Sequence, residues 1–222
     1  MTDSPQDASD DIDSEAASEQ SPSRDAAIRD VIAVVLLSVM AVLTAWCGFE
    51  SSKWGGAMSI EFSSASSSRI QAAVYEGQAR DQRQHDLTIY ASWIEASATG
   101  NEELADYIEG RFSPAFQPAF TAWREGGMSQ ESPFLLPEYV APGATEAADL
   151  TEQAQSHFAQ ALVNNQRGDQ YSLLTVLFAL VLFLTAMAQR RARTWVSWTY
   201  LSAGLVAGAT GTIILLNLPV LI

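Results

Sequence analysis

VIAVVLLSVMAVLTAWCGF, residues 31–49, carries no charged side chain. Two more uncharged apolar stretches follow at residues 171–188 and 195–222. Each is long enough to cross ~30 Å of hydrocarbon as a helix that rises ~1.5 Å per residue. A helix also satisfies its own backbone hydrogen bonds, as the interior of a bilayer requires. The sequence therefore predicts an all-α integral membrane protein with three transmembrane helices, of which the first covers residues 24–49.

The arginines predict the topology. The short loop at residues 189–194 is basic because it contains Arg190, Arg191 and Arg193, and such loops stay in the cytoplasm under the positive-inside rule. This assignment puts residues 50–170 on the extracytoplasmic side of the cell membrane and the N-terminus in the cytoplasm. The alternative topology, with the large domain inside, would place three arginines in a short external loop.

The chain is strongly acidic, with a formal net charge of -14. Such a balance argues against nucleic acid as a partner, because nucleic-acid binding needs clustered Lys and Arg. Residues 1–23 are rich in Asp, Glu, Ser and Gln, and they cannot bury enough apolar surface to offset the entropy of ordering. We predict that they form a disordered cytoplasmic tail. Cys47 is the only cysteine, so an intramolecular disulfide is excluded.

Apolar residues at steps of three and four predict two long helices in residues 50–170. One covers Ser59–Ser97 and continues the first membrane helix outward. The other begins near Thr145 and runs without proline into the second membrane helix. Residues 126–143 are predicted to form a loop. The domain between the first two spans is therefore expected to be an extracytoplasmic helical bundle.

Two shorter helices are expected between the long ones. Asn101 is predicted to cap a helix at Glu102–Phe112, and the next helix is expected to begin near Pro114. This hairpin is predicted to cover the distal part of the first long helix. Aromatic residues fall on one stripe there, which favours a hydrophobic core over a ligand cage; they are Phe112, Phe116, Phe120 and Trp123.

The sequence offers few residues for chemistry. Asp81 and His85 share a helix face at a spacing that suits a metal ion, but a site needs at least one more ligand. His157, the only other histidine, is expected to lie too far along the bundle to reach them. The serines between residues 63 and 68 are expected to allow close helix approach. No catalytic, cofactor-binding or metal-binding residue is therefore predicted.

Small residues mark the third span. Gly204, Gly208 and Gly211 let a neighbouring helix approach closely, either within one chain or between copies in a homo-oligomer. Aromatic residues near the span ends are expected to anchor the protein at the headgroups; they are Trp46, Trp54, Tyr171, Trp195, Trp198 and Tyr200. Apart from the Cys47 thiol, no ionisable group is expected within a span, which argues against ion coupling.

Four motifs carry a resemblance: TAWCGFESSKWGG at residues 44–56, RFSPAFQPAFTAW at 111–123, SPFLLPEY at 132–139 and GDQYSLLTVLFALVLF at 168–183. In this order and spacing the chain resembles a family of uncharacterised bacterial multipass membrane proteins. The resemblance implies the same architecture and no catalytic residue.

The predicted function is a non-enzymatic interaction or sensing module in the lipid bilayer, with an unidentified protein partner. A subunit of a transporter or channel is one alternative, which would need polar residues along a path through the bilayer. A membrane-anchored hydrolase or metalloenzyme is another, which would need carboxylates and His85 to converge in a pocket.

Overall fold

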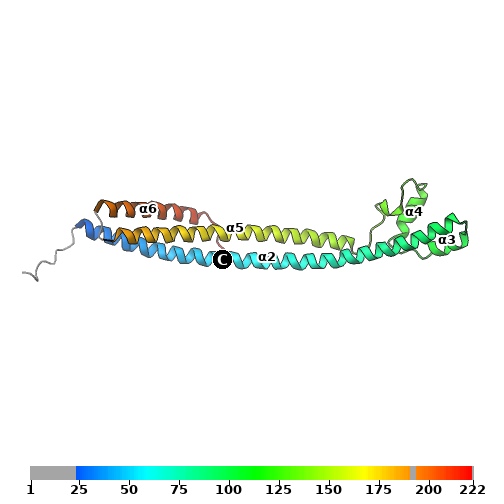
Figure 1. The fold of residues 1–222 in the computed structure, drawn as a ribbon, viewed down its shortest axis with the longest axis horizontal. Helices are drawn as coiled ribbons and strands as arrows, with labels where there is room; N and C mark the ends of the chain where they lie inside the picture. The colour runs from blue at the N-terminus through cyan, green and yellow to red at the C-terminus, as the bar shows by residue number, and fades with distance from the viewer. Residues whose placement is uncertain (1–23, 191–193, 222) are drawn as a thin grey trace, which may run out of the picture. The chain divides into compact units, whose positions relative to one another are not determined.

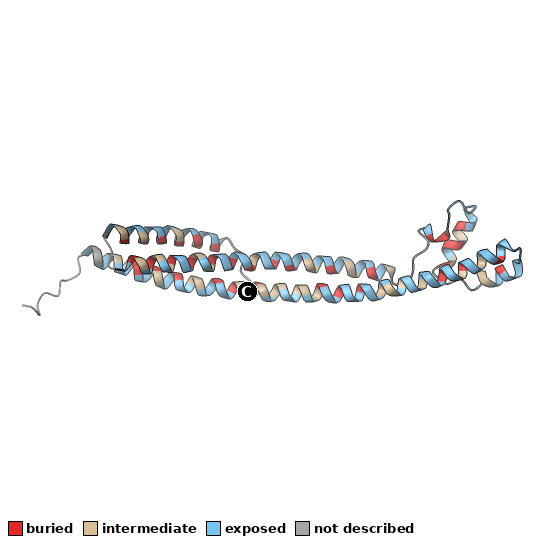
Figure 2. Ribbon diagram, viewed as in Figure 1, coloured by how far each residue is buried: buried red, intermediate tan, exposed pale blue. Residues whose placement is uncertain are grey.

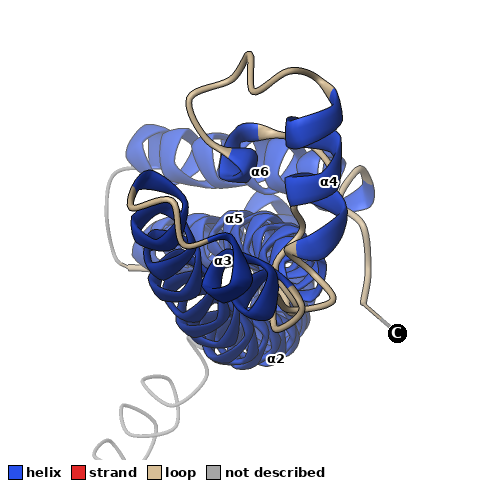
Figure 3. Ribbon diagram, turned by 90° about the vertical axis from the view of Figure 1, so that its right-hand side faces the viewer, coloured by secondary structure: helices blue, strands red, loops and turns tan. Residues whose placement is uncertain are grey.

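A computed structural model describes residues 24–190 and 194–221, and this part of the chain is helical without strands (Figures 1 and 3). The elements are α2 (Arg24–Ala98), α3 (Glu102–Glu109), α4 (Gln117–Glu125), the short 3-10 helix η1 (Pro133–Leu135), α5 (Ala144–Ala188) and α6 (Thr194–Leu216). Three of them, α2, α5 and α6, are long and apolar enough to cross a membrane. The predicted tail at residues 1–23, and Arg191 and Arg193 of the predicted basic loop, lie outside the described residues.

The chain divides into two compact units. Of the described residues, those up to Lys53 and from Arg167 onward form one, which we call the apolar unit, and residues Trp54–Gln166 form the other, the polar unit. The helices α2 and α5 contribute residues to both units. The predicted continuity of each long helix with its apolar segment is therefore confirmed.

In the apolar unit, α5 and α6 bury residues at alternating steps of three and four, the spacing of a coiled-coil seam. Figure 2 shows these buried positions along one side of each helix. The buried residues are Tyr171, Leu174, Phe178, Val181, Thr185 and Ala188 on α5, and Ser197, Leu201, Gly204, Gly208, Gly211 and Leu215 on α6. Exposed positions between them are also apolar, among them Leu205, Val206 and Ile213. A helix with apolar residues on its exposed face is typical of a membrane span.

In the polar unit, α2 and α5 run antiparallel. Glu61 of α2 contacts His157 of α5, and farther along α2 the backbone of Tyr75 lies close to Gly143, just before α5 begins. Small buried residues repeat along this pair; they are Ala65, Ser68 and Ala72 on α2, and Ala147, Ala154 and Ala161 on α5. Of the serines at residues 63–68, Ser68 is buried and the others are not, so the role of the serine segment in close helix approach stays a prediction.

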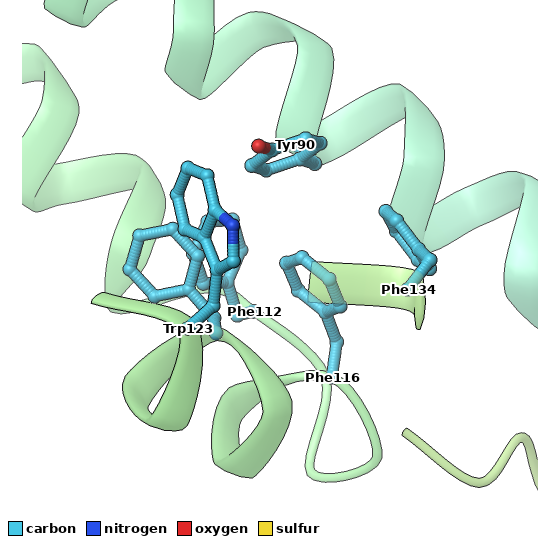
Figure 4. Packing of buried hydrophobic residues seen from close by; sticks show 6 residues of the cluster. Tyr90, Phe112, Phe116, Trp123 and Phe134 are labelled. Atoms are coloured by element: carbon cyan, nitrogen blue, oxygen red, sulfur yellow. The ribbon is translucent and has the colours of Figure 1, made fainter. Parts of the chain in front are cut away.

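Aromatic side chains form the core at the far end of α2 in the polar unit (Figure 4). Tyr90 of α2 meets the rings of Phe116, Phe120 and Trp123 edge-on, with centroids 5.6, 6.4 and 6.0 Å away. Phe116 and Phe120 are 0% exposed. The predicted stripe is therefore a hydrophobic core, and α4, one of the two helices expected to cover this part of α2, packs against it there.

Two predicted helix boundaries were wrong. The short helix capped by Asn101 ends at Glu109 and not at Phe112, because Gly110 follows as its C-cap and glycine is unfavourable within a helix. The next helix begins at Gln117, after a turn in which the Ser113 hydroxyl accepts the Phe116 N–H at 3.1 Å. The predicted Asn101 cap is confirmed, since its side chain accepts the N–H of Leu104.

Candidate binding site

The pair considered for a metal ion, Asp81 and His85, is exposed on α2. Across residues 24–190 and 194–221, no group of three His, Cys, Asp or Glu side chains is arranged to hold a metal ion. These two side chains therefore have no third ligand among the described residues, and a site of this kind needs one.

The other histidine belongs to the contact between the two long helices. His157 Nδ1 lies 2.7 Å from Glu61 Oε2, and both side chains are partly exposed. At the next residue of each helix, the rings of Phe62 and Phe158 pack edge-on with centroids 5.5 Å apart. An exposed pair of this kind contributes little to stability, so we assign it no role beyond the contact between α2 and α5.

The most buried carboxylate of the polar unit is Asp86, with 2% of its surface exposed. Its Oδ2 accepts a hydrogen bond from the Tyr139 hydroxyl at 3.1 Å, and its Oδ1 accepts one from Gln82 Nε2 at 3.0 Å. Burial raises the pKa of Tyr139 well above its ordinary value, the Asp86 carboxylate raises this pKa further, and Arg83 opposes the rise. Asp86 thus ties the loop that carries Tyr139 to α2.

A pocket of about 390 Å³ lies next to Tyr139, the residue that donates to Asp86. Its walls come from α2, from the loop between α4 and α5, and from the first residue of α5; the lining residues are Ala79, Arg80, Arg83, Phe134, Tyr139, Val140, Ala141 and Ala144. The Arg83 guanidinium lies 5.9 Å from the centre of the Phe134 ring. The pocket therefore combines cationic groups on one wall with aromatic and aliphatic groups on the other, a composition common in small-molecule sites.

The apolar unit contains a second buried carboxylate, Glu50, with 1% of its surface exposed. Its Oε2 accepts the backbone N–H of Leu221 at 3.0 Å, and the nearby Tyr171 hydroxyl donates to the carbonyl of Pro219 at 3.1 Å. These bonds tie the segment after α6 back onto α2 and α5. Glu50 directly follows the first apolar run, and its side chain is thus packed inside the apolar unit and not exposed to solvent.

The glycines of the third span pack within the chain. A side chain at position 204 would approach Thr185, one at 208 would lie 3.1 Å from Met40, and one at 211 would lie 2.7 Å from Phe178. These close approaches correspond to the first of the two predicted alternatives, in which the glycines let helices of one chain pack closely. Self-association through Gly204, Gly208 and Gly211 stays a prediction.

Two of the aromatic residues predicted as headgroup anchors are buried in the protein. Trp54 is 4% exposed and Tyr171 is 0% exposed, so their rings pack against other residues and the anchoring interpretation is wrong for them. Trp46 and Trp195, in contrast, are exposed, as an anchor at the membrane surface must be.

Sequence reasoning missed Asp86 and Tyr139. A signal was present for the aspartate, because Asp86 continues the seven-residue series of Ala65, Ala72 and Ala79 on α2, and a charge on a buried seam requires a partner. No comparable signal marks Tyr139, whose position depends on the path of the loop.

Comparisons with protein-family models, with curated proteins and with solved structures find no match to this chain. The resemblance of its four motifs to a bacterial membrane-protein family therefore stays a prediction.

Proposed function

We propose that this chain is a multipass protein of the cell membrane that acts as a non-enzymatic interaction or sensing module. In this proposal the polar unit is extracytoplasmic and the N-terminus is cytoplasmic. The orientation is supported by the three arginines between the second and third apolar segments, of which Arg190 is among the described residues.

The observation that carries the proposal is the make-up of the pocket walls. Arg80 and Arg83 belong to α2, and Ala144 begins α5. A ligand in the pocket touches both long helices at once, and its binding energy depends on how they are spaced there. Ligands shift a protein toward the arrangement that they bind best.

Both of these helices also supply residues to the apolar unit. Each of these helices is therefore continuous from the pocket into its apolar segment. In this proposal, a shift of α2 or α5 at the pocket displaces residues of the same helix in the membrane. Continuity alone is not coupling, so the proposal requires a measured response of the apolar unit.

Photo-crosslinking in native membranes tests the interaction. A photoreactive residue at Leu135, which is 61% exposed on the pocket loop, is compared with one at Tyr107, which is 58% exposed on α3. We expect discrete protein adducts from at least one of the two positions, identified by mass spectrometry. Adducts to lipid alone from both positions, together with solute flux through liposomes that contain the purified protein, would favour a channel or transporter subunit and overturn the proposal.

A further inference from the structure

The charge of the pocket lining is opposite to that of its surroundings. Residues 54–166 carry fifteen acidic side chains and five arginines. The pocket is lined by two of those arginines, Arg80 and Arg83, and by none of the fifteen acids. In a unit with such an excess of carboxylates, a lining that contains two arginines and no acid favours an anionic occupant.

Neither guanidinium of the lining is used in an ion pair within residues 54–166. Arg124 provides the contrast, because its guanidinium forms two hydrogen bonds with the Glu109 carboxylate at 2.6 and 2.7 Å. Arg80 and Arg83 are exposed, and no carboxylate of the residues that the structure describes lies within 4.0 Å of their nitrogens. Their spacing of three residues puts them on one face of α2, where both can reach one oxyanion.

The remaining walls are apolar. Phe134 is buried, Tyr139 has its hydroxyl turned to Asp86, and the lining is completed by three alanines and Val140. An inorganic anion would leave this surface in contact with water, whereas a ligand with an apolar body removes it from water. The volume of about 390 Å³ lies in the range of about 300–1,000 Å³ that is typical of small-molecule pockets.

We propose that the pocket binds a small amphiphilic organic acid, with its carboxylate on Arg80 and Arg83 and its apolar body against Phe134 and Val140. The proposal rests on the proposed function of the polar unit as a binding module, and it names the class of ligand. The guanidinium groups match a carboxylate in bidentate geometry. Tyr139 does not contact the carboxylate in this arrangement, because its hydroxyl is committed to Asp86. It forms part of the wall instead.

The test is calorimetric titration of the full chain in phosphatidylcholine nanodiscs with 2-naphthoate, after subtraction of the signal from empty nanodiscs. Acetate has the charge without the apolar body, and 2-naphthamide has the body without the charge. We expect both to bind at least about tenfold more weakly than 2-naphthoate, since each lacks one of the two contributions. Equal binding of 2-naphthoate and 2-naphthamide would overturn the role of the arginines.

Variants locate the binding. Arg80→Gln and Arg83→Gln are each expected to weaken 2-naphthoate binding at least about tenfold, the loss of one charge-assisted hydrogen bond. Arg111→Gln removes the same charge from a residue outside the lining, and we expect it to leave binding unchanged. An equal loss in all three variants would mean that the net charge of the unit, and not the pocket, attracts the anion.

A second matched pair tests the apolar wall. Val140 and Val74 are 54% and 55% exposed, and Val140 alone of the two lines the pocket. Val140→Asp is expected to abolish binding by repelling the carboxylate, while Val74→Asp leaves it intact. Because both positions are exposed, folding is expected to survive, and unchanged circular dichroism verifies it.

Absence of 2-naphthoate binding below about 1 mM in folded wild-type protein overturns the ligand assignment. That result leaves the proposed function standing if crosslinks to a partner are found. Conversely, ligand binding without a crosslinked partner or a response of the apolar unit would overturn the sensing proposal and keep the pocket assignment.

Discussion

Replacement of Phe120 by alanine tests the aromatic core of the polar unit. Phe120 is 0% exposed, and its ring packs edge-on against Phe112 and Trp93 with centroids 4.7 and 4.8 Å away. Truncation of a buried phenylalanine costs ~3–5 kcal/mol, which combines lost transfer free energy and a cavity. Part of this is the contact between rings, worth ~0.5–1.5 kcal/mol for each pair.

Hydrogen exchange of the protein in nanodiscs measures this loss. If α3 and α4 open together with the core, a loss of ~3–5 kcal/mol speeds the exchange of their amides roughly 10²- to 5×10³-fold. Tyr107→Ala is the matched control, because Tyr107 is 58% exposed on α3 and an exposed substitution is expected to change stability by less than about 0.5 kcal/mol. A change below about 1 kcal/mol for Phe120→Ala would refute the core assignment, since buried phenylalanines cost far more.

Two further perturbations test the contacts described above. Tyr139→Phe leaves one oxygen of Asp86 without its donor and is expected to cost ~1–3 kcal/mol in thermal unfolding. Since the pKa of Tyr139 is raised in the folded protein, the stability that its hydroxyl contributes is present below about pH 10, the usual tyrosine pKa, and is lost as the pH rises above that value. Tyr139→Phe should therefore lose less stability over that rise than wild type. An equal loss in both proteins would contradict the bond between Tyr139 and Asp86. Gly208→Ile forces a side chain against Met40, so overpacking of ~1–3 kcal/mol should lower thermal stability with an unchanged sedimentation coefficient. Conversion of an oligomer to monomer by this variant would instead show that the stripe joins two copies.

The helical framework was predictable because its causes are local. Apolar runs mark the three segments able to span a membrane, the spacing of Phe112, Phe116 and Phe120 marks the core of the polar unit, and Asn101 marks a helix start. Each of these signals depends on residues within a few turns of one another.

The candidate site was not predictable for the opposite reason. The bond between Asp86 and Tyr139 joins residues that are 53 positions apart, and the loop that carries Tyr139 has no period from which its path can be read. The same holds for Glu50, which is buried because the chain after α6 returns and donates the N–H of Leu221. Contacts of this kind depend on tertiary packing, which a single sequence does not encode in its local pattern.

The most direct test of the account is cysteine labelling in intact cells after Cys47→Ser. A cysteine at Ser129, in the loop that follows α4 in the polar unit, is predicted to react with a membrane-impermeant maleimide. A cysteine at Thr194, next to the arginine-rich loop, is predicted to react only after the cells are permeabilised, because positively charged short loops stay inside. Labelling of Thr194→Cys but not Ser129→Cys in intact cells would contradict the extracytoplasmic placement of the polar unit, and with it the proposed role as an external binding module.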